Sequence, residues 1–296
     1  MGELAGLATS FFWALSSVFF TRAGKQIGSV NVNRIRLAFA VALVMLAHLV
    51  TQGSLLPLNA GSERWMWLGL SGFIGLVLGD SFLFQAYILV GNRLGTLMLS
   101  LSPVAGVLIA WIFLGEQLAP LAIAGIVLSL AGVALVVLKG TPGNGGVHDR
   151  RRFAIGILCG LGGAIGQAAG LVLAKKGLAG DFPALSGVVI RMLVAAIAIW
   201  VVAFLFGQLR STILAARNTS ALQAVGAGAV VGPFIGVWLS LVAVQLTFVG
   251  IASTLTSLAP IFVLPIAKFV NKEEVNRWAV LGTVIAIAGV AIIFFQ

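Results

Sequence analysis

The sequence predicts an all-α integral membrane protein with ten transmembrane helices, arranged as two inverted five-helix repeats. Three observations lead to this fold class: an apolar composition, ten apolar runs of bilayer length, and an internal repeat. Of the 296 residues, 60% are hydrophobic and 9% are charged, and the mean hydropathy is +1.13. Soluble domains are about half apolar and about a quarter charged. The composition therefore excludes a water-soluble enzyme, a disulfide scaffold and a disordered regulator, since no single core could hide so much apolar side chain.

The charge balance is strongly basic, with 18 Lys and Arg against 8 Asp and Glu. In a soluble protein this excess would favour nucleic-acid binding. Here the basic residues lie in short breaks between apolar runs, where they set membrane orientation, so we expect no nucleic-acid partner. The single cysteine, Cys159, can form no internal disulfide, and no thiolate pair exists for a metal. The first apolar run follows Glu3 and not a basic segment, which predicts a retained span in place of a signal peptide.

Each predicted helix corresponds to one apolar run, because a bilayer core needs about 20 apolar residues and unpaired backbone groups are costly in lipid. Turn-forming residues separate the runs, as at Gly91-Asn92. The Gly-rich stretch 139–152 divides the chain into a first repeat, 1–138, and a second repeat, 153–296. The ten predicted spans are 4–20, 33–51, 66–90, 94–114, 119–138, 153–173, 185–206, 221–247, 251–270 and 277–295.

The internal repeat appears when the chain is shifted by 157 residues. Ser100-Leu101-x-Pro103 then meets Ser257-Leu258-x-Pro260, and Glu116 meets Glu273. Nearer the start of each half the offset differs, and Arg36 pairs with Arg191. Five spans per half place the second half in the membrane with the opposite orientation, as in many secondary transporters. Glycines coincide as well: Gly69, Gly75, Gly79, Gly125 and Gly132 meet Gly226, Gly232, Gly236, Gly282 and Gly289.

Two features of the repeat suggest movement. Pro103 and Pro260 lie at equivalent depths in the fourth and ninth spans, and proline bends a helix by removing a hydrogen bond, so we interpret both as hinges or as kinks that shape the cavity. Glycines recur every three or four residues along spans 3 and 6. Such stripes are packing seams between membrane helices, and sliding along them is an alternative that the sequence leaves open.

These motifs carry a family resemblance over essentially the whole chain. The segments Leu99-Ser100-Leu101-Ser102-Pro103 to Leu114-Gly115-Glu116, and Leu258-Ala259-Pro260 to Lys272-Glu273-Glu274, resemble the EamA family of the drug/metabolite transporter superfamily. The chain is most similar to bacterial amino-acid exporters of the aromatic-amino-acid efflux type. The resemblance implies a multi-pass protein of the bacterial inner membrane that exports small metabolites without a cofactor.

The candidate substrate site consists of polar and aromatic side chains at membrane depth. Asp80 is the only acidic residue well inside a span. It is either paired with a basic group or binds a substrate amine or a proton. Arg36 and Arg191 either snorkel to the interface or bind a carboxylate. The predicted cavity residues are Trp13, Ser17, Asp80, Phe84, Gln85, Tyr87, Ser100, Gln167, Trp238, Gln245 and Ser257.

The function that fits these features is secondary transport of small metabolites, above all amino acids, by alternating access. Drugs, other metabolites and lipids on the same fold are the alternatives. A membrane-embedded enzyme is disfavoured because Asp80 has no second intramembrane carboxylate. We expect a small-molecule substrate, a surrounding bilayer, a monomer and no metal. Proton coupling and facilitated flux both stay open, and Asp80→Asn should weaken or uncouple transport while leaving folding intact.

The distribution of basic residues predicts orientation. Fourteen of the 18 Lys and Arg residues lie in the odd-numbered breaks and three in the even-numbered ones. The positive-inside rule then places the odd-numbered breaks in the cytoplasm and both termini outside. Relatives in the superfamily are often drawn with both termini inside, and we give the uneven distribution more weight.

Overall fold

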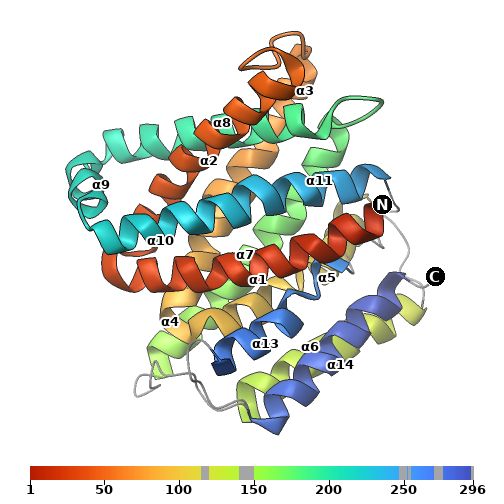
Figure 1. Ribbon diagram of the computed structural model, residues 1–296. Coiled ribbons are helices and arrows are strands. Elements are labelled where there is room, and N and C mark those ends of the chain that lie inside the picture. The colour runs from red at the N-terminus through yellow and green to blue at the C-terminus, as the bar shows by residue number, and fades with distance from the viewer. Residues whose placement is uncertain (115–119, 140–149, 247–251, 253–254, 270–275, 295–296) are drawn as a thin grey trace.

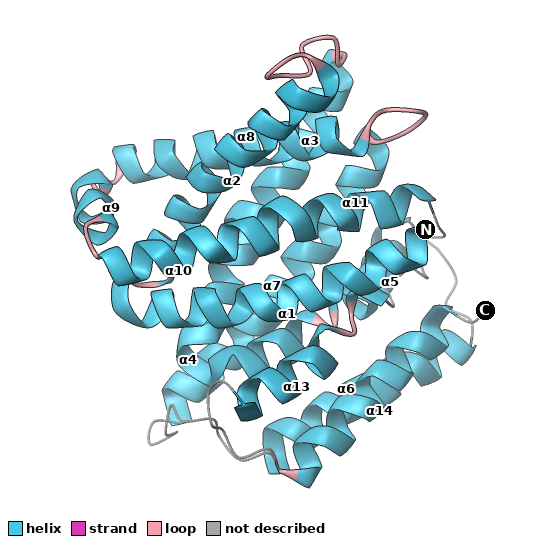
Figure 2. Cartoon of the chain, viewed as in Figure 1, coloured by secondary structure: helices cyan, strands magenta, loops and turns pink. Residues whose placement is uncertain are grey.

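The protein is a bundle of helices, and all regular structure in the described residues is helical (Figures 1 and 2). The computed structural model describes residues 1–114, 120–139, 150–246, 252, 255–269 and 276–294. Most of the predicted linker 139–152 and the paired Glu116 and Glu273 lie outside these residues. The elements are α1 (Gly2–Ile27), α2 (Ser29–Gln52), α3 (Ser62–Gly72), η1 (Phe73–Gly79), α4 (Asp80–Leu99), α5 (Ser102–Leu114), α6 (Pro120–Lys139), α7 (Arg150–Gly177), α8 (Ala184–Leu205), α9 (Leu209–Ala216), α10 (Thr219–Ala229), η2 (Val230–Gly236), α11 (Val237–Leu246), α13 (Ala259–Phe269) and α14 (Arg277–Phe294).

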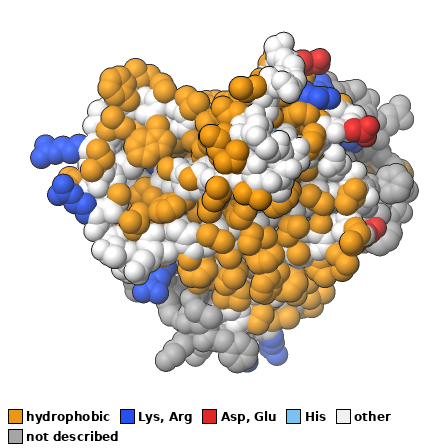
Figure 3. All heavy atoms as spheres, turned by 45° about the horizontal axis from the view of Figure 1, so that its top comes forward, with side chains coloured by type: hydrophobic (Ala, Val, Ile, Leu, Met, Phe, Trp, Pro, Cys, Tyr) orange, Lys and Arg blue, Asp and Glu red, His pale blue; other side chains and the backbone are white. Residues whose placement is uncertain are grey.

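Seven helices in the described part of the chain are long and apolar enough to cross a membrane. The predicted spans 94–114, 251–270 and 277–295 coincide with shorter helices, so the ten-helix count stays a prediction. The fourth and ninth spans are short because each is interrupted just before its proline: α5 has 13 residues and α13 has 11. Apolar side chains cover most of the face in Figure 3, with Lys and Arg at its margins, as expected of a lipid-facing surface.

The continuous helix Ser62–Leu99 reverses direction at Gly91. Gly91 has φ 82° and ψ 163°, a backbone conformation that residues with a side chain rarely adopt. A Cβ on Gly95 would overlap the ring of Tyr87, although residues eight apart in a straight helix are separated by about 12 Å. The chain therefore turns back at Gly91, and α4 contributes to both the third and the fourth predicted spans.

The repeat is visible in the backbone as well as in the sequence. The two π-helical segments, η1 and η2, begin at Phe73 and Val230, and these positions differ by the same 157 residues. The starts of α3 and α10 and of α5 and α13 differ by 157 as well. Single-turn π-helical segments are uncommon and are found frequently at functional sites. Both halves thus place the same irregularity in the third span.

The two halves interlock by exchanging their first helices. Helix α1 packs against α10, η2 and α11 of the second half, while α7 packs against α3, η1 and α4 of the first (Figure 1). Glycines permit this closeness: a Cβ on Gly166 would lie 2.6 Å from the Cα of Gly79. The last helices, α6 and α14, pack mainly on each other. The space between the two halves is therefore enclosed by helices from both.

The count of loop charges assigned Arg34 and Arg36 to the break between the first two spans, although the predicted span 33–51 contains both; the structure corrects that count. Helix α2 begins at Ser29, so both arginines lie within it and are buried. The guanidinium of Arg34 donates to Thr212 Oγ1 (3.0 Å) and to Gln208, which holds the short helix α9 against α2. The sequence did not predict α9, because eight residues with both apolar and basic side chains form no span.

Candidate functional site

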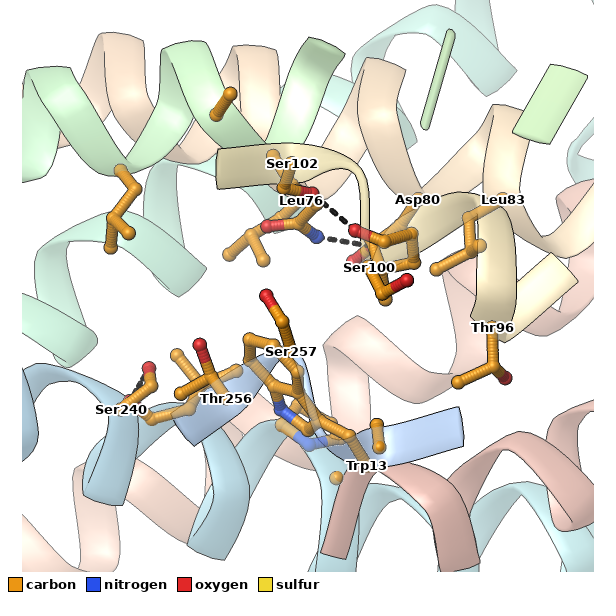
Figure 4. A pocket seen from close by; sticks show the side chains of 18 of the residues that line it. Trp13, Leu76, Asp80, Leu83, Thr96, Ser100, Ser102, Ser240, Thr256 and Ser257 are labelled. Atoms are coloured by element: carbon orange, nitrogen blue, oxygen red, sulfur yellow. Dashed lines mark hydrogen bonds between the residues drawn. The ribbon is translucent and has the colours of Figure 1, made fainter. Parts of the chain in front are cut away.

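A cavity of about 670 Å³ lies between the halves. Its lining comes from α1, α2, η1, α4, α5, α7, α8, η2, α11 and α13, together with residues 100, 256 and 257. Figure 4 shows Trp13, Ser240, Thr256 and Ser257 facing Asp80, Ser100 and Ser102 across open space. This volume lies within the usual range for small-molecule sites, and the mixture of apolar walls with a few polar groups is typical of them.

The helix breaks of the fourth and ninth spans lie at the cavity. The chain forms turns at 100–101 and 257–258, and α5 and α13 begin directly afterwards. Because Pro103 has no N–H, the carbonyl of Leu99 loses its usual helical partner. The hydroxyl of Ser102 donates to that carbonyl instead (2.7 Å), and Ser100 donates to Leu97 O (2.7 Å). The break is thus stabilised by local hydrogen bonds and places polar groups at membrane depth.

Asp80 and Arg36 form a buried ion pair in the first half. Gln167 Nε2 donates to the other carboxylate oxygen of Asp80 (2.7 Å). The guanidinium of Arg36 also donates from Nε to Asn33 Oδ1 (3.0 Å) and from Nη2 to Leu76 O (3.3 Å). Of the two interpretations of Asp80, the structure matches the one in which its carboxylate is paired. Arg36 points inward and does not snorkel to the interface.

Aromatic rings surround this ion pair. The guanidinium carbon of Arg36 lies 5.0 Å from the ring centroid of Phe84 and 6.0 Å from that of Phe20. The rings of Phe84 and Tyr87 are stacked at 5.9 Å. Such cation–π contacts stabilise a desolvated guanidinium. These rings give the cavity an apolar wall next to its charged centre.

Arg191, the repeat partner of Arg36, has different surroundings. It lines the cavity, its exposed fraction is 3%, and its Nε has no hydrogen-bond partner among the described residues. A Cβ on Gly75 would lie 3.5 Å from Arg191 Nη2, so the guanidinium is close to the backbone of η1. Asp80 is near enough to interact with it electrostatically. The carboxylate of Asp80 therefore interacts with two guanidinium groups. Of these two, Arg36 forms the hydrogen-bonded ion pair.

The structure brings most of the predicted site residues to this cavity. Its lining includes Trp13, Asp80, Phe84, Tyr87, Ser100, Gln167, Ser257 and the predicted hinge Pro103. The other predicted residues have their contacts elsewhere. Ser17 donates to Ala14 O, Gln85 accepts from Ser29, Gln245 donates to Phe182 O, and Trp238 packs near Phe234. The predicted hinge residue Pro260 is buried next to the lining residue Ala259.

Sequence reasoning missed several lining residues that the repeat could have identified. At the offset of 157, seven pairs of equivalent residues both line the cavity. Val237 and Val244 are the repeat equivalents of the candidates Asp80 and Tyr87, so the repeat could have identified both. Ser240 and Thr256 correspond to Leu83 and Leu99, which are apolar and were not candidates. Phe20 carried no signal, because it is one apolar residue in an apolar run. The seven pairs are Leu76/Pro233, Asp80/Val237, Leu83/Ser240, Tyr87/Val244, Leu99/Thr256, Ser100/Ser257 and Ser102/Ala259.

Membrane-length apolar helices, two interlocked repeats and a central cavity define a multi-pass membrane protein of transporter architecture. The chain belongs to the EamA-like transporter family, within the drug/metabolite transporter superfamily, since the family profile matches residues 1–138 and 154–295. Members of this family are transporters and not enzymes. A solved crystal structure of another protein has the same fold, with a TM-score of 0.68 and 19% identity over 98% of this chain and 94% of the other. No curated protein matches the chain.

Proposed function

We propose that this protein is a secondary transporter that exports small metabolites, above all amino acids, across the bacterial inner membrane. The observation that carries the proposal is the cavity into which both helix breaks open. Its lining is related by the repeat, so rocking one half against the other would expose the same groups to either side. Breaks before Pro103 and Pro260 give both halves a place to bend.

The composition of the lining supports an amino acid as the solute. Trp13, Phe20 and Phe84 provide an apolar wall, and the arginines and serine hydroxyls provide polar contacts. An amino acid combines an apolar side chain with two charged groups on one carbon atom. The cavity offers both environments, because its lining combines aromatic rings with charged and hydroxyl-bearing side chains.

Counterflow in proteoliposomes tests this proposal. Vesicles containing the purified chain are loaded with one unlabelled amino acid, and uptake of labelled methionine, threonine or phenylalanine is followed. We expect accumulation that depends on the internal amino acid. A folded protein that exchanges none of them would contradict amino-acid export and favour the alternative solutes, drugs, other metabolites or lipids.

A cavity-filling variant ties exchange to this site. Gly106 lines the cavity, and a Cβ there meets nothing within 4 Å, so Gly106→Phe would occupy the cavity without displacing backbone. We expect exchange to be lost while the protein stays monodisperse. Gly61→Phe is the matched control, because Gly61 is exposed, equally open and outside the cavity lining. Equal exchange rates for Gly106→Phe and Gly61→Phe would show that the solute does not pass through this cavity.

A further inference from the structure

The repeat is symmetric in its arginines but not in its carboxylates. Arg36 and Arg191 are equivalent residues, and both line the cavity. The 157-residue offset that relates η1 to η2 also relates Asp80 to Val237, and both of these line the cavity too. The first half therefore holds a complete arginine–carboxylate pair, whereas the second half holds the arginine and has a valine in the position of the carboxylate.

This asymmetry leaves positive charge in the cavity. The charged residues of its described lining are Arg36, Asp80, Lys175, Lys176 and Arg191, four basic and one acidic. Lys175 and Lys176 are exposed, whereas Arg36 and Arg191 are buried. A buried charge without a bonded partner is costly, and a bound anion would remove that cost. The described lining offers an ammonium group no carboxylate other than Asp80, which Arg36 already binds.

The helix breaks add to the positive potential. Helices α5 and α13 begin at Ser102 and Ala259, and both of these residues line the cavity. The N-terminus of a helix carries a partial positive charge and unpaired N–H groups, which favour an anion nearby. The arginine fork and the two helix N-termini therefore favour the same kind of ligand group.

We infer that Arg191 binds the carboxylate of the transported solute, which occupies the position that the Asp80 carboxylate occupies beside Arg36. This inference rests on the proposed transport function and narrows its substrate class. The solute is a small carboxylate whose amino group is dispensable for binding. An aromatic or aliphatic acid lacking the amine should bind, and the corresponding amine lacking the carboxylate should not.

Thermal unfolding of the purified full-length chain tests this with three probes: 3-phenylpropionate, phenylalanine and phenethylamine. A ligand that binds only the folded state raises Tm in proportion to its occupancy. We expect the two carboxylates to raise Tm and the amine to have no effect. In Arg191→Gln the half-saturating carboxylate concentration should rise about ten- to one-hundredfold, as for loss of a hydrogen bond to a charged group. Arg191→Lys keeps the positive charge but loses the forked guanidinium, so its half-saturating concentration should lie between those of the wild type and Arg191→Gln.

The unliganded proteins provide a second readout. Because Nε of Arg191 has no hydrogen-bond partner in the described part of the chain, Arg191→Gln should unfold at the same temperature as the wild type or higher. Arg34→Gln is the matched control, since Arg34 is equally buried, bonds to Thr212 and Gln208, and lies outside the cavity lining. That variant should unfold at a lower temperature and keep the wild-type response to carboxylates. A purely structural role for Arg191 predicts that both variants unfold at a lower temperature.

The outcomes separate this inference from the proposed function. Stabilisation by phenethylamine, no stabilisation by any probe, or an unchanged carboxylate response in Arg191→Gln would each overturn it. Amino-acid counterflow with an unchanged Arg191→Gln response would overturn the inference and keep the function. Arg191-dependent carboxylate binding without amino-acid counterflow would keep the inference and contradict amino acids as the transported solute.

Discussion

At the scale of single residues, the ion pair between Arg36 and Asp80 changes what is expected of an Asp80 variant. The sequence alone suggested that Asp80→Asn would leave folding intact. In the structure this change leaves Arg36 buried without its counter-ion. Breaking a buried pair costs about 3–5 kcal/mol, so we expect Asp80→Asn to lower the free energy of unfolding by that order. Denaturant unfolding in detergent measures this loss.

The double variant Arg36→Met with Asp80→Leu provides the control for that prediction. Replacing both partners by apolar residues of similar volume is often neutral, so the double variant should recover most of the stability that Asp80→Asn loses. An Asp80→Asn protein as stable as the wild type would show that the pair contributes nothing to folding.

At the scale of helices, the prolines of the fourth and ninth spans are predicted to matter for exchange. Pro103→Ala restores a backbone N–H, which lets α4 and α5 join across the break; alanine is favoured over proline by up to about 3 kcal/mol in a helix interior. We expect higher thermal stability and a slower counterflow rate. Pro265→Ala is the control, because Pro265 lies inside α13, is exposed, and has Leu108 as its repeat counterpart. Faster exchange in Pro103→Ala would contradict the hinge.

The seam between α7 and η1 gives a second prediction at this scale. A Cβ on Gly166 would lie 2.6 Å from Gly79 Cα, so Gly166→Ala must push two backbones apart. Overpacking of this kind costs about 1–3 kcal/mol. Gly226→Ala is the matched control, because its Cβ would meet only Phe39 Cζ at 3.9 Å and alanine favours a helix by up to about 1 kcal/mol. Thermal unfolding should show a lower Tm for Gly166→Ala and an unchanged or higher Tm for Gly226→Ala. Equal changes in Tm would mean that the contact between α7 and η1 is not tightly packed.

The comparison of sequence with structure is also clearest at this scale. Apolar runs predicted where the long helices lie, because each long helix needs one such run. They did not predict the breaks at 100–101 and 257–258, since those residues are as apolar as their neighbours apart from one serine in each. Asp80 and Gln167 were predicted as cavity residues, but their contacts depend on the exchange of α1 and α7 between halves. No local pattern records that exchange.

At the scale of the whole molecule, the lysines at the cavity indicate on which side of the membrane it opens. Lys175 and Lys176 line it and are exposed at the C-terminal end of α7. These lysines lie in the even-numbered break between the sixth and seventh predicted spans. Arg34 and Arg36 are buried inside the protein and no longer count as loop charges, which leaves 12 basic residues in the odd-numbered breaks against three. The imbalance still places the even-numbered breaks outside.

The cavity is therefore predicted to open to the outside in this conformation. Cys159 is the single cysteine, so Cys159→Ala gives a background in which one introduced thiol reports on its own position. Exposed positions lie at opposite ends of the molecule, Lys176 at the end of α7 and Arg210 at the start of α9. In intact spheroplasts a membrane-impermeant maleimide should label Lys176→Cys. It should label Arg210→Cys only after the membrane is permeabilised, because the intact bilayer blocks the reagent. The reverse pattern would place both termini and the cavity opening in the cytoplasm.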